Sequence, residues 1–140
     1  MKKIFRTKIL ALILLVTGTL MLVACQPGGS ESVLLQGAVT IGPIFPVEIP
    51  GDTRPVPPEV FAARKIVIYD GSGKKLVRDI AITQIGQGPT GYYTAQLAPG
   101  TYTVDINRLG MDRADNLPQK ISPSADETVT IDVNIDTGIR

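Results

Sequence analysis

The sequence contains no histidine and no tryptophan, and it has a single cysteine, Cys25. Without histidine the chain lacks the commonest general base and the commonest zinc ligand, and it cannot form a Ser-His or Cys-His dyad. A single cysteine also excludes an intramolecular disulfide. The sequence has neither a Gly-x-Ser-x-Gly elbow nor a Gly-rich loop followed by Lys-Ser or Lys-Thr. We therefore expect a protein that is not an enzyme, has no catalytic residues and binds no cofactor.

Long apolar runs are confined to the first part of the chain. Four basic residues among the first eight precede an apolar stretch over residues 9–23, which Gly18 interrupts. This stretch is shorter than the roughly 20 residues that a membrane-spanning helix needs. A basic start followed by a short apolar segment is typical of a cleaved secretory signal.

The apolar stretch ends in Leu22-Val23-Ala24-Cys25, which resembles the lipobox of bacterial lipoproteins. The resemblance implies that residues 1–24 are removed and that Cys25 receives a diacylglycerol and an N-acyl chain. Two or three acyl chains anchor a protein stably. We therefore expect Cys25 to be the lipidation site, with the protein held in the cell membrane or outer membrane on its extracytoplasmic side. Gln26 replaces the aspartate that signals inner-membrane retention in this family, which favours an outer membrane where one exists.

The charge balance changes once the signal is removed. The whole chain has 14 bases and 13 acids. Four of these bases belong to the signal, so residues 25–140 carry a net charge of −3. A mildly acidic surface argues against a nucleic-acid partner. The Gly- and Ser-rich residues 25–32 are expected to form a flexible tether, and residues 33–140 a single domain.

Alternating apolar and polar residues predict β-strands throughout this domain. Gly37 marks a bulge or a close approach within the first strand. Turn signals recur every 8–12 residues and helix patterns are lacking, so we expect an all-β fold, a single antiparallel Greek-key sandwich of about seven strands. The expected strands cover residues 33–41, 65–70, 76–85, 92–97, 101–107, 119–122 and 127–135.

The segment 42–59 stands apart because it is rich in proline, which excludes helix and central strand. Two interpretations remain open. A long irregular segment is often functional. Alternatively, it forms a stiff cover over a sheet edge that blocks strand addition. Its prolines are Pro43, Pro46, Pro50, Pro55, Pro57 and Pro58.

The hairpin sequence over residues 91–104 contains Leu97-Ala98-Pro99-Gly100-Thr101-Tyr102-Thr103-Val104. It resembles the signature hairpin of carboxypeptidase regulatory-like domains, which belong with the transthyretin-like and Cna B-type prealbumin-like sandwiches. The resemblance spans residues 33–137 and implies a β-sandwich scaffold without a defined activity. Some Cna B-type domains form a Lys–Asn cross-link. The first strand here has no lysine, and Asn134 is expected to face solvent.

Two further motifs, Gly42-Pro43-Ile44-Phe45-Pro46-Val47 and Asp136-Thr137-Gly138-Ile139-Arg140, are similar to segments of a set of small exported bacterial proteins. In many of those proteins, a cysteine stands at the position of Phe45 and pairs with another in the Pro-rich loop. This chain lacks that disulfide, so we expect packing of Phe45 to hold the loop.

The one weak metal candidate is a calcium site formed by Asp112, Asp115 and Asn116, whose oxygens suit a hard cation. The same residue types are common in ordinary turns, and Arg113 reduces the negative charge of the cluster.

Together these features favour a membrane-anchored, non-catalytic binding, adhesion or structural module at the cell envelope. Its expected partners are membrane lipid, through Cys25, and an unknown envelope protein or glycan. The alternative is a calcium- or ligand-binding accessory domain that regulates a separately encoded envelope enzyme. Loops on a rigid sandwich usually carry recognition, so the segments 42–62 and 108–118 are the expected contact surfaces.

Overall fold

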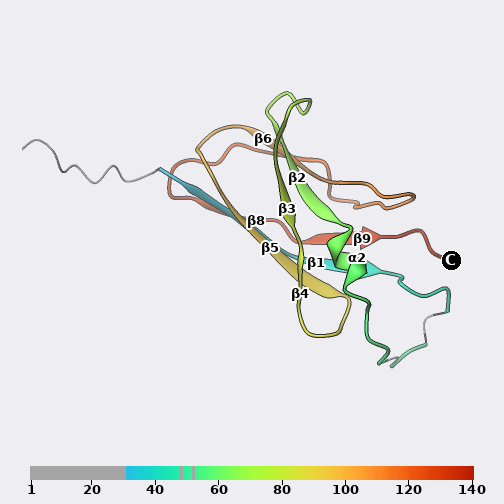
Figure 1. The fold of residues 1–140 in the computed structure, drawn as a ribbon. Coiled ribbons are helices and arrows are strands. Elements are labelled where there is room, and N and C mark those ends of the chain that lie inside the picture. Colours follow the sequence, from blue (N-terminus) through green and yellow to red (C-terminus); the bar gives the residue numbers. More distant parts are fainter. Residues whose placement is uncertain (1–30, 48, 52) are drawn as a thin grey trace, which may run out of the picture. The chain divides into compact units, whose positions relative to one another are not determined.

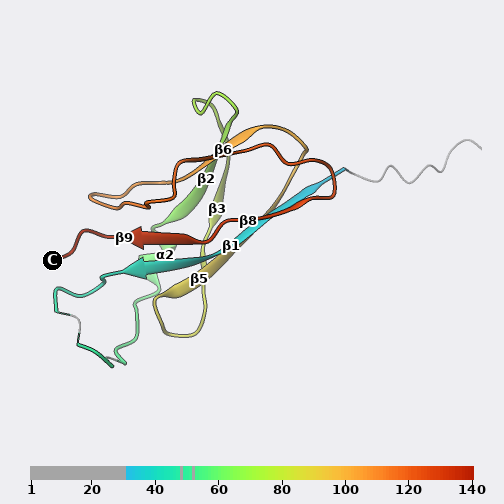
Figure 2. The ribbon, with the colours of Figure 1, turned by 180° about the vertical axis from the view of Figure 1, so that it is seen from behind.

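Two β-sheets pack face to face in the computed structural model, which describes residues 31–47, 49–51 and 53–140 (Figures 1 and 2). Sheet A has the order β4-β5-β1, and both β8 and β9 pair with the other edge of β1; sheet B has the order β3-β2-β6-β7. The strands of sheet A are β1 (Val33–Gly42), β4 (Thr83–Gln84), β5 (Thr90–Leu97), β8 (Thr128–Thr130) and β9 (Val133–Asp136). Those of sheet B are β2 (Lys65–Asp70), β3 (Leu76–Ala81), β6 (Tyr102–Ile106) and β7 (Gln119–Ile121). The predicted all-β sandwich is confirmed.

The expected signal, the expected lipidation site Cys25 and most of the expected tether lie outside the described residues. No helix in the part of the chain that the structure covers is long and apolar enough to cross a bilayer. The single helix that is described, α2 (Glu59–Ala62), is four residues long and follows the last two prolines of the Pro-rich segment. Prolines are well tolerated where a helix begins, because the first helical N–H groups have no intrahelical partner.

The core lies between the sheets and follows from the alternation of the strands. In β5, every second side chain is buried from Gly91 to Leu97, and the intervening ones are exposed. Such alternation arises because successive side chains of a strand point to opposite faces. The largest fully buried side chains come from both sheets and from α2: Tyr93, Phe61, Leu35, Ile41, Ile66, Ile68 and Ile135.

The expected strand over residues 76–85 is divided in the structure. Its first part is β3 in sheet B, and its second part is β4 in sheet A. The chain changes sheets at Ile82, which is buried like Ile80. Both isoleucines face the core as their spacing predicts. Alternation reports the buried face alone, so it did not reveal that the two halves pair with different strands.

The C-terminal strand also differs from the expected antiparallel pattern. It is split into β8 and β9, and both run parallel to β1. The break falls at Ile131 and Asp132, opposite Gly37, where a Cβ atom would collide with the carbonyl oxygen of Ile131. Gly37 is therefore a point of close approach, as predicted. Asn134 is exposed, which confirms the expectation that it faces solvent.

Three hydrogen bonds close this break. The hydroxyl of Tyr93 donates a 2.8 Å hydrogen bond to the carbonyl oxygen of Ile131, and the Ala38 N–H donates one of 2.8 Å to Oδ1 of Asp132. The Ile131 N–H donates to the carbonyl oxygen of Gln36 at 2.9 Å. The backbone at the break between β8 and β9, and the neighbouring part of β1, therefore have hydrogen-bond partners, as buried polar groups require.

The irregular segments collect at the Gly42 end of β1. The Pro-rich segment, α2, the connection 107–118 and residues 137–140 meet there (Figures 1 and 2). At about 3.3 Å per residue, the ten residues of β1 place this end about 30 Å from Val33, where the chain enters the sandwich. We call these segments, with the turn 85–90, the loop end.

Candidate binding surface at the loop end

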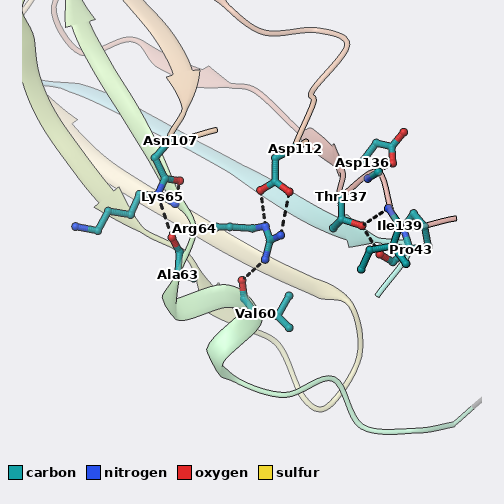
Figure 3. A network of polar contacts seen from close by, with 11 residues as sticks. Pro43, Val60, Ala63, Arg64, Lys65, Asn107, Asp112, Asp136, Thr137 and Ile139 are labelled. Carbon is teal, nitrogen blue, oxygen red and sulfur yellow. Dashed lines mark hydrogen bonds and ion pairs between the residues drawn. The ribbon is translucent and has the colours of Figure 1, made fainter. Parts of the chain in front are cut away.

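An ion pair joins α2 to the connection 107–118. Arg64 Nε lies 2.8 Å from Asp112 Oδ2, and Arg64 Nη2 lies 3.0 Å from Asp112 Oδ1 (Figure 3). The side chains of Arg64 and Asp112 are 14% and 3% exposed, respectively. Arg64 Nη1 also donates to the carbonyl oxygen of Val60 at 2.9 Å. A bidentate pair of this kind fixes orientation as well as distance.

Asn107 provides a second link between the same segments. Its Nδ2 donates to the carbonyl oxygen of Ala63 at 3.0 Å, and its Oδ1 accepts the N–H of Lys65 at 2.6 Å (Figure 3). One amide side chain thereby satisfies two backbone groups at the start of β2. The base of the connection 107–118 is consequently fixed to the end of α2.

The segments 42–47 and 136–140 lie side by side, although they are far apart in the sequence. The Thr137 N–H donates to the carbonyl oxygen of Gly42 at 3.2 Å, and the Thr137 hydroxyl donates to that of Pro43 (Figure 3). Arg113 and Asp136 exchange two backbone hydrogen bonds, each 2.8 Å long. The Gly-Pro motif, the C-terminal motif and the connection 107–118 therefore form one structural junction.

In the C-terminal motif, Arg140 and Gly138 both hydrogen-bond to the side-chain carboxylate of Asp136. Arg140 Nη2 lies 2.8 Å from Asp136 Oδ2, and the Gly138 N–H donates to Asp136 Oδ1 at 2.9 Å. Gly138 has a φ of +72°, which favours glycine at this turn. The hydrogen bond from Arg140, followed by that from Gly138, lowers the pKa of Asp136 to about 2.

The calcium candidates do not form a ligand set. Both oxygens of Asp112 accept hydrogen bonds from Arg64, and Asn116 directs its Nδ2 to the carbonyl oxygen of Asp132 at 2.8 Å. Asp115 is exposed. Among the residues that the structure describes, no three His, Cys, Asp or Glu side chains gather in a way that could hold a metal ion. Calcium binding therefore receives no support from this geometry.

The Pro-rich segment lies at the loop end, where Gln84 of the edge strand β4 donates from its Nε2 to the carbonyl oxygen of Val56 at 3.1 Å (Figure 1). Val56 is buried, and its N–H donates to the carbonyl oxygen of Gln87 at 2.8 Å. The guanidinium of Arg54 lies 4.0 Å from the ring centroid of Phe45. Phe45 thus helps to hold the loop through a cation–π contact, which sequence reasoning did not anticipate. These residues line a shallow pocket of about 220 Å³ together with Ile44, Ile49, Gly51 and Pro89.

Of the eight large apolar side chains that are exposed among the described residues, five belong to segments of the loop end. Val47, Ile49 and Met111 are 68%, 63% and 65% exposed, respectively, and Ile85 and Leu109 are exposed as well. The polar groups beneath them are paired with one another, as described above. The loop end therefore combines rigidly fixed loop bases with apolar tips. Sequence reasoning located both loops but missed Arg64, because no local pattern signals a partner 48 residues away.

The sequence matches no established protein family, and it matches no curated protein. One solved structure with a similar arrangement is the crystal structure of a DUF3823 family protein from Parabacteroides merdae ATCC 43184. The similarity covers 76% of this chain and 46% of that one, with 18% sequence identity and a TM-score of 0.39. The present chain thus matches less than half the length of that protein.

Proposed function

We propose that this protein is a lipid-anchored, non-catalytic binding module of the cell envelope, held by Cys25 and contacting its partner through the loop end. The observation that carries the proposal is the presence of five exposed apolar side chains on loops whose bases are fixed by hydrogen bonds. Exposed apolar patches are typical of interaction sites. A surface whose supporting loops are already fixed loses less conformational entropy when it binds.

The position of the loop end supports this role. The chain enters the sandwich at Val33, eight residues after Cys25 in the sequence. The loop end lies at the opposite end of β1 from this entry point. The finer assignment to the prealbumin-like domains is part of this proposal. Its support is the hairpin after β5, where the Tyr102 hydroxyl donates to the Ala98 carbonyl oxygen at 2.9 Å.

The anchor is tested with Cys25→Ser in the full chain. We expect the variant to lose the mass of the lipid and to leave the membrane fraction. The wild-type protein is expected to stay with the membrane in high salt and to be released by detergent. A Cys25→Ser protein that remains in the membrane fraction would contradict the anchor.

The loop end is tested separately, by chemical cross-linking in whole cells. The variant Val47→Ser/Ile49→Ser/Met111→Ser removes the three most exposed apolar side chains, and Leu76→Ser/Val77→Ser removes two others from β3 as a matched control. We expect the loop variant to lose the cross-linked species of the wild type and the β3 variant to keep them. Equal cross-linking by all three proteins would show that the loop end is not the contact surface.

A further inference from the structure

The outer face of sheet A carries almost no charge. Its five strands contain neither lysine nor arginine, and their single carboxylate, Asp136, is paired with Arg140 at the loop end. The one other acid of this face is Asp132, between β8 and β9. In place of charges, the face presents rows of hydroxyl and amide side chains: Gln36, Thr40, Thr83, Thr94, Gln96, Thr128, Thr130 and Asn134.

A shallow hollow of about 400 Å³ lies in the middle of this face. Gly37 and Ala38 line this hollow. The side chain of Ala38 faces outward and is short, whereas the close approach of Ile131 and Tyr93 to Gly37 lies on the core side of the sheet. Tyr92 stands beside the hollow, directly opposite Ala38 in the pairing of β1 and β5, and is 46% exposed. The hollow continues along β1 toward Thr40 and Asn134, as a second depression that shares Ala38 and Asp132 with the first.

The polar side chains of this face are available to a ligand, and Gln36, Thr94 and Thr130 among them line the hollow itself. Within the part of the chain described, none of the eight hydroxyl and amide side chains hydrogen-bonds to another protein group, and neither does the Tyr92 hydroxyl. This differs from the loop end, where Asn107, Thr137 and Arg64 all bond within the protein. Hydroxyl and amide groups both donate and accept hydrogen bonds, so they can pair with a ligand whose polar groups also do both.

We propose that the hollow on the outer face of sheet A binds a neutral glycan, whose sugar ring lies against Tyr92 and whose hydroxyls bond the Thr, Gln and Asn rows. Sugar hydroxyls donate and accept as these side chains do, and an exposed tyrosine ring offers a flat, partly apolar surface. No lysine or arginine lines the hollow, where Asp132 would repel an acidic ligand, and a purely apolar ligand would leave the polar rows unpaired. This inference deepens the proposed binding role by naming a ligand class, on a surface distinct from the loop end.

The experiment measures co-sedimentation of the full-length chain with insoluble cellulose, chitin and starch granules, in a detergent without a sugar headgroup. Tyr92→Ala removes the ring, and Ala38→Arg fills the hollow. Tyr69→Ala and Ala81→Arg make the same changes on the outer face of sheet B. Thermal melting checks that all four variants fold.

We expect binding to at least one of the three polysaccharides, weakened about tenfold or more by each sheet A variant and unchanged by each sheet B variant. Three results would overturn the proposal: no binding to any polysaccharide, equal losses from both pairs of variants, or a dimer without polysaccharide binding that Ala38→Arg dissociates. None of these results depends on Cys25 or on the loop-end variants, so failure here is distinguishable from failure of the proposed function.

Discussion

The outer faces of the two sheets are built from different side chains. The strands of sheet B contain six charged residues, Lys65, Asp70, Arg78, Asp79, Asp105 and Lys120. Several are paired, as in Lys65 with Asp79 and Asp105 with Arg108. The face of sheet A is uncharged apart from its acids, and its unusual feature is the close backbone approach at Gly37. On sheet B the charges largely neutralise one another. On the outer face of sheet A, the eight hydroxyl and amide side chains have no hydrogen-bond partner within the described residues.

The close approach in sheet A should be the most sensitive point of the sandwich. In Gly37→Ala, the new Cβ collides with the Ile131 carbonyl oxygen and lies 2.9 Å from the Tyr93 ring. We expect the free energy of unfolding to fall by about 3 kcal/mol, measured by urea denaturation. Gly88→Ala is the control, because a Cβ there meets no atom within 4 Å. Similar stabilities of the two variants would refute the role of Gly37.

The Arg64–Asp112 pair should be next in importance, because Asp112 is almost fully buried. Arg64→Leu leaves its carboxylate without a partner, and we expect a loss of about 2 to 3 kcal/mol in the free energy of unfolding. The double variant Arg64→Leu/Asp112→Leu removes both charges, and it should recover most of that loss. A double variant as unstable as the single one would show that the pair itself, and not the unpaired carboxylate, dominates.

The hydroxyl of Tyr93 should have a smaller and pH-dependent effect. Tyr93→Phe leaves the Ile131 carbonyl oxygen without this donor, at a cost of about 1 to 2 kcal/mol at neutral pH. Burial, with a smaller contribution from Asp132, raises the pKa of Tyr93 above its ordinary value. The stabilisation from the neutral hydroxyl is thus complete below about pH 10 and is lost as the pH rises further. Denaturation measured from pH 8 to 11 should show this alkaline loss in the wild type and a smaller one in Tyr93→Phe.

The Lys65–Asp79 pair on sheet B should matter least for stability. Both side chains are nearly half exposed, and water and salt screen such pairs. The Lys65 hydrogen bond and charge lower the pKa of Asp79, so any contribution is present above about pH 4 and disappears as the pH falls. We expect Lys65→Ala to leave the melting temperature unchanged while the Asp79 pKa, followed by NMR, rises. A clear drop in melting temperature would show that the charged face of sheet B is not merely a solvated surface.

The sequence predicted those features that depend on local pattern. The alternation of Val129, Ile131, Val133 and Ile135 identified the buried face of the last strand, and Gly37 was recognised as a close-approach point. The direction of that strand and the change of sheets at Ile82 were not predictable, because alternation does not determine which strand pairs with which. Of the loop end, the sequence indicated the Pro-rich segment and the segment 108–118, but not that they meet the C-terminal motif. The hollow on sheet A was missed, since rows of Thr, Gln and Asn on separate strands become adjacent only after pairing.

The central place of β1 determines how the sandwich would respond to a pulling force. β1 is the first strand of the described chain, and it is hydrogen-bonded to β5 on one edge and to β8 and β9 on the other. Tension applied through residue 32 would run along β1, perpendicular to its ladder hydrogen bonds, and would load them in shear. A strand clamped on both edges over nearly its whole length is well placed to resist extraction. A module tethered in front of this strand would therefore carry mechanical load through its best-supported element.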